Sequence, residues 1–211
     1  SFRPPPSTHH PLSMYIQSFC HIHDRRVIVD GQTRFEAADR QTSAADFLAD
    51  AFRHTGIDYR KFYKMDPLAR LGFLAAELIL PTADEQPKED MGIICFNSTS
   101  SLAADRIYQR TIPAGDDFFP SPADFVYTLP NIVTGEIAIR HKIQGETMFY
   151  VLPTFCYIAC EAIEEAGLRR LLIGWIDADI DRLEARVLLC GTRSTGVCRR
   201  FTHGAINNLF P

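Results

Sequence analysis

The sequence predicts a mixed α/β fold in which a five-stranded sheet carries helices on both faces. Segments rich in β-branched, aliphatic and aromatic residues alternate with segments whose apolar residues recur at helical spacing. The order is strand, helix, strand, helices, strand, helix, strand, strand, which favours a mixed sheet between layers of helices. The five predicted strands are Tyr15–Ile22, Met91–Phe96, Thr147–Leu152, Leu171–Ile176 and Ala185–Cys190.

Capping residues and prolines mark the predicted helices. Asp66 precedes Pro67, which combines an N-cap side chain with proline at the first helical position, and apolar residues follow at helical spacing to Ile79. Ser121 and Pro122 repeat the pattern. Further helices are predicted around 44–54, from the polar run 97–101 to about 110, over 129–144 with a break at Pro130, and over 155–166.

The most informative segment is Leu129–Val151. It predicts a helix with small and apolar residues on one face, a glycine stop at Gly145 and then a buried strand. The chain continues through Thr154 and Phe155 to Cys156, where the next helix begins. A strand, a tight turn and a helix N-terminus often hold a nucleophile, because free N–H groups and the helix dipole stabilise negative charge there.

The composition favours one globular domain. The chain has 211 residues, of which 46% are apolar and 23% charged, as in an ordinary soluble core. We expect residues 1–13 to form a disordered leader, residues 14–190 the domain, and residues 191–211 an irregular tail. The connection 24–63 is polar and predicts an irregular surface segment apart from its short helix.

Charge and cysteine usage restrict the function classes. A formal net charge of −4 gives no electrostatic support for binding nucleic acid or anionic membranes. No apolar run approaches the roughly 18 residues of a membrane span, and no secretory signal is evident. Most of the six cysteines lie in or beside apolar segments, which favours a reduced, cytoplasmic protein. Their spacing predicts no metal site, and no cofactor site is predicted.

Three weaker candidates have simpler explanations. An acidic cluster follows the fourth strand and predicts a solvated hairpin rather than a calcium loop, because the turn glycine and the later glutamate are missing; its members are Asp177, Asp179, Asp181 and Glu184. His21 and His23 share one face of the first strand and predict an edge or surface position rather than a metal site. Trp175 is predicted to belong to the core.

Several segments, in the same order and at similar spacing, resemble the β-ketoacyl-acyl-carrier-protein synthases, which have a thiolase-like fold. The resemblance covers roughly residues 14–190 and corresponds to the N-terminal half of those enzymes. It implies a thiolase-like half with a mixed five-stranded sheet. The similar segments are Lys64–Glu77, Met91–Ser101, the Phe119-Pro-Ser-Pro run, Leu129–Arg140 and Gly145-Glu-Thr.

The resemblance also implies a cysteine nucleophile after the third strand. Counting from Gly145 without gaps places Thr154 at that position, whereas counting backward from residues 161–166 places Cys156 there. The neighbours Phe155 and Tyr157 are bulky where the family has small residues, so they would crowd a pantetheine thioester. The family's second half supplies two histidines, and His203 resembles one of them only superficially.

Three functions follow from the resemblance. The favoured one is a synthase-like protein associated with acyl-chain condensation in fatty-acid or polyketide-type biosynthesis, without autonomous catalysis. Its partners would be an acyl carrier protein and either a full-length ketosynthase or a second copy of this chain in a dimer. The second is an active acyltransferase of the 3-oxoacyl-acyl-carrier-protein synthase type, with Cys156 as acyl acceptor. The third is a binding or regulatory module on the same fold. Alternatively, Cys156 and Cys160 simply line the buried face of a helix.

Overall fold

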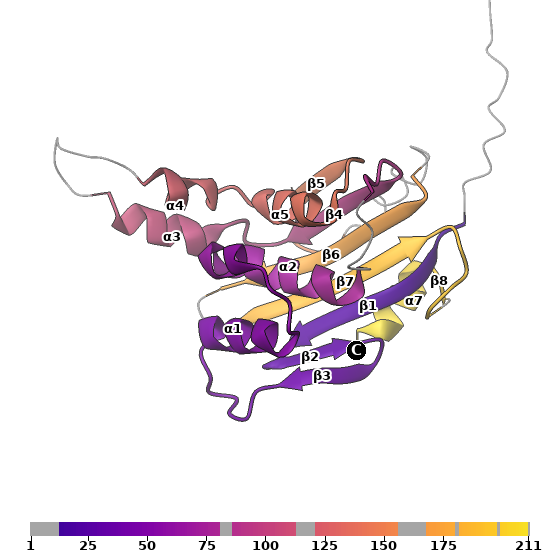
Figure 1. Cartoon of the computed structure of the whole chain (residues 1–211), viewed down its shortest axis with the longest axis horizontal. Coiled ribbons are helices and arrows are strands. Elements are labelled where there is room, and N and C mark those ends of the chain that lie inside the picture. Colours follow the sequence, from indigo (N-terminus) through magenta and orange to yellow (C-terminus); the bar gives the residue numbers. More distant parts are fainter. Residues whose placement is uncertain are drawn as a thin grey trace, which may run out of the picture.

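A computed structural model describes residues 13–80, 86–112, 121–155, 168–179, 182–197 and 199–210. They form one eight-stranded mixed sheet with the order β3-β2-β1-β7-β6-β4-β5, and β8 pairs with β1 (Figure 1). The strands are β1 Tyr15–His23, β2 Arg26–Val29, β3 Gln32–Glu36, β4 Met91–Asn97, β5 Thr147–Val151, β6 Arg170–Ala178, β7 Leu183–Gly191 and β8 Arg199–Arg200. The helices are α1 Ala44–His54, the short 3₁₀ helix η1 Arg60–Lys64, α2 Pro67–Ile79, α3 Leu102–Arg110, α4 Pro122–Val126, α5 Ile132–His141 and α7 His203–Leu209.

The predicted mixed α/β class is confirmed, but the number of strands is not five. All five predicted strands are present as β1, β4, β5, β6 and β7, and β2, β3 and β8 are additional. β2 and β3 occupy the segment that we predicted to be irregular. Two-residue turns at Asp24–Arg25 and Asp30–Gly31 connect β1, β2 and β3, and all four residues have positive φ, as type I′ hairpin turns require.

Parallel and antiparallel pairing meet in the middle of the sheet. β4 pairs in parallel with β5 and β6, whereas β7 is antiparallel to β6 and β1. Every residue of β4 is buried, as its unalternating apolar sequence predicts. β5 lies at the edge and exposes much of its length, so the prediction of a buried strand was wrong there. Among the described strands, β5 has a neighbour on one side only, which is β4.

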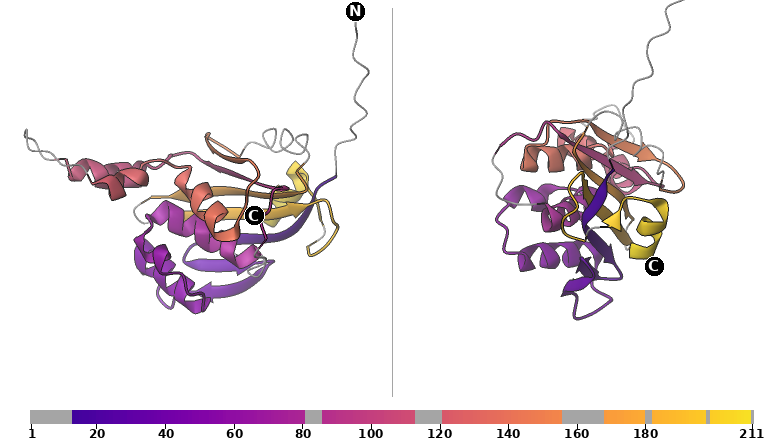
Figure 2. Two further views of the ribbon diagram at one scale, coloured as in Figure 1. Left: turned by 45° about the horizontal axis from the view of Figure 1, so that its top comes forward. Right: turned by 90° about the vertical axis from the view of Figure 1, so that its right-hand side faces the viewer.

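Helices cover both faces, as predicted. α1, α2 and α5 pack on one face over the larger core, which includes Phe47, Phe73 and Ile137 (Figures 1 and 2). α7 packs on the other face, where Ile206 and Phe210 join the second core. α3 and α4 project beyond the end of the sheet (Figure 2). Within the described ranges, no helix combines the length and apolar character needed to cross a membrane.

The described residues after 191 include the short strand β8 and the helix α7. Arg200 pairs with Tyr15, and the backbone N–H of Phe201 donates to the carbonyl of Met14. Thr202 caps α7 by accepting from the N–H of Ala205. Burial of its side chains against the sheet holds this segment in place, although its sequence shows no clear helical periodicity. The division into a leader, a domain and a tail stays a prediction.

Two predicted helix caps are confirmed. The Asp66 carboxylate accepts from the N–H groups of Leu68 and Ala69, and the Ser121 hydroxyl accepts from the N–H of Asp124. Ser101 also occupies an N-cap position, before α3, but its hydroxyl donates to the carbonyl of Thr128 instead. Ser101 therefore ties the start of α3 to the loop after α4.

Replacing Asp66 with asparagine should preserve the cap and raise stability at neutral pH. Burial raises the pKa of Asp66 to about 6, although the N–H donors of Ala69 and Leu68 oppose the shift. A raised folded-state pKa means that stability falls as pH rises from about 4 through 6. In urea denaturation, Asp66→Asn should therefore match or exceed the wild type at pH 7.5 and lose that advantage near pH 5, while Asp66→Ala should lose about 1 kcal/mol. Equal losses in both variants would contradict this assignment.

A buried ionic cluster connects α2 and α5. The Glu77 carboxylate lies 2.8 Å from Arg140 Nε and 3.0 Å from His141 Nε2, and its side chain is fully buried. Lys88 Nζ donates to the carbonyl of His141, and Lys61 lies 2.7 Å from the largely buried Glu136. These contacts orient α5, which leads into β5.

Candidate functional site

A cavity of about 390 Å³ opens on the face of the sheet that α7 partly covers. It lies at the carboxyl ends of the parallel strands β4, β5 and β6, where ligands commonly bind in α/β sheets. The floor comes from β6 and β7, and the walls come from the segment after β5 and from α7. The lining residues are Ser98, Pro153, Thr154, Phe155, Trp175, Asp177, Arg182, Glu184, Arg186, Leu188, Ile206, Asn207 and Phe210.

The strand register places large side chains in one row across this face. His21 lies opposite Arg186, Arg186 opposite Trp175, Trp175 opposite Phe96, and Phe96 opposite Tyr150. Residues directly opposite each other in a sheet share a face, so these five side chains form a continuous row. The row brings a guanidinium and an indole to the cavity floor.

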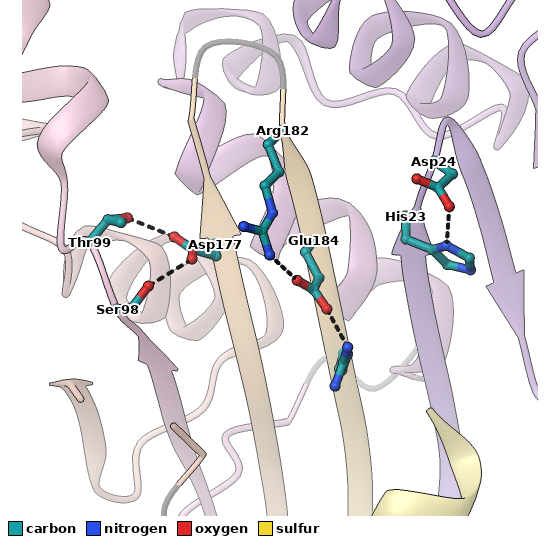
Figure 3. Close-up of polar contacts among 8 residues, drawn as sticks. His23, Asp24, Ser98, Thr99, Asp177, Arg182 and Glu184 are labelled. Carbon is teal, nitrogen blue, oxygen red and sulfur yellow. Dashed lines mark hydrogen bonds and ion pairs between the residues drawn. The ribbon is translucent and has the colours of Figure 1, made fainter. Parts of the chain in front are cut away.

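A polar network lies beside this row, at the ends of the strands. Asp177 accepts from the hydroxyls of Ser98, at 3.0 Å, and Thr99, at 2.6 Å (Figure 3). Glu184, which lies opposite Asp177, accepts from Arg182 at 3.0 Å and also pairs with Arg186. Both carboxylates therefore have partners within the protein.

Aromatic side chains restrict the cavity. Phe155 packs on Phe96 with ring centroids 5.0 Å apart, and Trp175 is half-buried at the floor, where it packs against the second core. Phe210 packs edge-on against Phe19, at 5.8 Å, and its ring lies 6.0 Å from the Arg186 guanidinium carbon. Phe155 therefore lines the cavity, and its crowding of a thioester stays a prediction.

His21 and His23 do not lie on an edge strand, because β1 runs between β2 and β7; His21 is buried and His23 is partly exposed. Their rings stack 4.0 Å apart, and His21 is buried beneath Phe210. Burial, together with the neighbouring His23 and Arg186, lowers the pKa of His21 to about 4, so this imidazole is neutral at pH 7. His23 lies 3.2 Å from Asp24 (Figure 3).

The predicted nucleophile positions have different outcomes. Thr154, the position reached by counting forward, lines the cavity. Cys156 lies outside the described residues, as does the predicted helix 155–166 except for Phe155. The role of Cys156 therefore stays a prediction. His203 begins α7, and its side chain also lies outside the described part. The described residues that line the cavity include neither a cysteine nor a histidine.

The acidic cluster is divided between the network and the surface. Asp177 and Glu184 belong to the network, Asp179 lies 3.5 Å from Arg106, and Asp181 is outside the described residues. Across the described chain, no three histidine, cysteine or carboxylate side chains gather closely enough to hold a metal ion.

Sequence reasoning missed Arg186, whose position at the site depends on the register between β6 and β7. The alternation of Glu184, Arg186 and Leu188 was the available signal, because alternate residues of a strand share a face. The sequence alone does not show which residues of β6 lie opposite them.

By sequence, no protein family and no curated protein matches this chain. By structure, it is similar to the ishigamide ketosynthase/chain length factor, with a TM-score of 0.59 and 14% identity over 85% of this chain and 62% of that one. It is also similar to a structure of the ketosynthase ApeO in complex with its chain length factor ApeC from Xenorhabdus doucetiae, with a TM-score of 0.56 and 14% identity over 85% of this chain and 79% of that one. A third similar structure holds the type II polyketide synthase proteins AntDE and the acyl-carrier protein AntF, with a TM-score of 0.61 and 12% identity over 86% of this chain and 62% of that one.

These similarities show the class of fold. The chain has a thiolase-like fold of the ketosynthase type, which confirms the fold expected from the sequence resemblance. It spans about three fifths of the first of these chains.

Proposed function

We propose that this chain is a non-catalytic accessory subunit of acyl-chain condensation. The observation that carries the proposal is the wall of the cavity beyond β5, where Thr154 occupies the position reached by counting forward from Gly145 and the Phe155 ring packs on Phe96. Claisen condensation on a carrier-bound thioester needs a thiolate nucleophile and groups that stabilise an oxyanion. A threonine beside a phenylalanine ring supplies no thiolate, and Phe155 restricts access for a thioester.

The partner would be a ketosynthase-fold subunit, either a full-length synthase or a second copy of this chain. Among the described strands β5 pairs with β4 alone, and its Tyr150 and Val151 are exposed. An open strand edge with apolar side chains is a surface that native proteins normally cover. Six further exposed apolar side chains lie nearby or on the projecting helices. They are Leu102, Ile107, Phe125, Val126, Leu129 and Ile139. An acyl carrier protein would deliver the substrates to the assembled pair.

The chemistry is tested by incubating the chain with acyl-carrier thioesters, alone and with a full-length ketosynthase, and measuring acyl transfer by intact mass. We expect no acylation of the isolated chain. Product should form with the partner and survive both Cys156→Ala and the isosteric Thr154→Val. A Val151→Lys variant, which charges the β5 edge, should lose the partner-dependent product while keeping the wild-type free energy of unfolding.

The alternative is an active condensing enzyme with Cys156 as nucleophile, which the sequence resemblance supports. Acylation of the isolated chain that disappears in Cys156→Ala but persists in Thr154→Val would favour this alternative and overturn the accessory proposal. If the chain binds neither carrier protein nor ketosynthase, both assignments fail.

A further inference from the structure

The helix α7 forms part of the cavity wall and is attached differently at its two ends. Before α7, the N–H of Phe201 donates to the carbonyl of Met14, and β8 pairs with β1. After α7, the Phe210 ring packs against Phe19, with centroids 5.8 Å apart, and against His21, at 5.2 Å. A helix of seven residues has little stability of its own, so its position depends on these anchors.

Release of the Phe210 end would open the cavity on this side. Three residues of the segment line the cavity, and they are Ile206, Asn207 and Phe210. Elements that cover a site commonly belong to the least stable parts of a protein, because they must move without unfolding the rest. The contacts beneath Phe210 therefore decide whether the cavity is covered.

Two stacked histidines lie beneath Phe210. The His21 and His23 rings are 4.0 Å apart and 27° from parallel, and His21 is 7% exposed. Two cations face the pair from neighbouring strands, since Arg186 lies opposite His21 and Arg26 lies opposite His23. Burial, then His23, then Arg186 lower the pKa of His21 to about 4. The docked position of Phe210 therefore favours a neutral imidazole beneath it.

The acids that face this buried imidazole are already paired with cations. Glu184 of β7 lies 3.0 Å from Arg182 and also pairs with Arg186. Asp24, in the turn after β1, lies 3.2 Å from the His23 ring (Figure 3). Both acids oppose the lowering of the imidazole's pKa, but less strongly than burial, His23 and Arg186 favour it. A proton on the imidazole would thus add a positive charge where little water and no unpaired carboxylate can stabilise it.

From these contacts we propose that α7, together with Phe210, is a lid on the cavity and that protonation of His21 releases it. At pH 7 the imidazole is neutral and Phe210 stays docked. Once Phe210 leaves, water reaches the imidazole, which then takes up a proton at the ordinary histidine pKa of about 6.5. Because the pKa is lower in the docked state, docking is favoured above about pH 6.5, and this contribution is lost as the pH falls toward 4. Opening of this kind needs no partner subunit and goes beyond the accessory role proposed above.

Hydrogen exchange, measured by mass spectrometry on the full chain, tests the lid. After correction for intrinsic exchange, the opening equilibrium of residues 203–210 should shift roughly 50-fold toward release between pH 7 and pH 4.5. Peptides from β6 and β7 should keep their protection, because the sheet itself does not open. Acrylamide quenching of Trp175, the one tryptophan in the sequence and a lining residue of the cavity, should increase over the same pH range.

Two variants separate His21 from the other histidines. His21→Gln removes the titrating group and keeps a polar side chain, so the opening equilibrium of 203–210 should change less than about threefold between pH 7 and pH 4.5. His54→Gln is the matched control, because His54 is exposed on α1 and contacts Phe35 rather than Phe210. Its lid should open with pH as in the wild type.

Unchanged protection of 203–210 in the wild type down to pH 4.5, or the same loss in folded His21→Gln, overturns the proposal. Loss of protection in β6 and β7 at the same pH also overturns it, because the whole domain would then be unfolding. If His21→Gln does not fold, NMR titration of the wild-type His21 ring decides. Protonation below about pH 5 together with movement of the Phe210 ring supports the lid, and titration near pH 6.5 with α7 still protected contradicts it. No ketosynthase or thioester enters these measurements, so their outcome is independent of the accessory role.

Discussion

Replacing Glu77 with alanine should lower the free energy of unfolding by about 3–5 kcal/mol. The Glu77 side chain has no exposed surface, and its removal leaves His141, 4% exposed, and Arg140 without their carboxylate partner between α2 and α5. Breaking a buried ion pair is expensive because the remaining charge has lost its solvent as well as its partner. Urea denaturation at pH 7 measures the loss.

The matched control is an exposed ion pair on the same face of the protein. Asp50 pairs with Arg53 at 2.6 Å on α1, where both side chains are about half exposed or more. Asp50→Ala should cost under about 1 kcal/mol, because solvent screens exposed pairs. If Asp50→Ala and Glu77→Ala lowered the free energy of unfolding by similar amounts, burial of the α2–α5 cluster would not determine how much the cluster stabilises the protein.

The effect of Glu77 should also depend on pH. Burial alone would raise the pKa of Glu77, but hydrogen bonds from His141 and Arg140 outweigh burial and hold its pKa below the ordinary value. The stability contributed by a lowered pKa is present above the unfolded pKa of about 4.3 and is lost as pH falls through the folded one. The difference between wild type and Glu77→Ala should therefore shrink below about pH 4.

Replacing Gly145 with alanine should destabilise the protein by about 3 kcal/mol, through overpacking against an unyielding backbone. A Cβ at this position would overlap the carbonyl oxygen of Met91 at the start of β4, so β4 and β5 could not keep their spacing. Gly135 on α5 is the matched control, because a Cβ there meets nothing within 4 Å. Gly135→Ala should stabilise the helix by about 0.5–1 kcal/mol. The thermal unfolding temperature should fall in Gly145→Ala and rise in Gly135→Ala. A shift in the same direction in both variants would contradict the predicted clash at Gly145.

Local side-chain chemistry made much of the fold predictable. Asp66 and Ser121 cap their helices as expected because capping involves residues only two or three positions apart in sequence. The buried strand β4 was evident from its continuous apolar run. The same locality explains why α1 was found at 44–54, where Ser43 accepts from the N–H of Asp46.

The elements that were missed depend on tertiary contacts. β3 is almost wholly exposed and polar, so its own sequence gave little indication of a strand, and the local signals for its hairpin were the Asp30–Gly31 turn and the β-branched run of β2. α7 has seven residues, which are too few for apolar residues to show a helical spacing. Ile206 and Phe210 hold it against the second core. The site depends on the pairing of Arg186 with Trp175, which belong to different strands. The resemblance directed attention to the segment after β5, and the structure adds Arg186 to it.

The pairing of β1 determines when this sheet can be completed. β1 forms its local hairpin with β2, but on its other side Tyr15 pairs with Gly191 of β7 and with Arg200 of β8. A nascent chain emerging from the ribosome would therefore hold β1 with one unpaired side until almost all of these residues had been made. Contacts between residues so distant in sequence slow folding and leave aggregation-prone edges exposed meanwhile. The sheet can therefore be completed only after β7 and β8 have been synthesised, and until then one side of β1 is open to pairing with other chains.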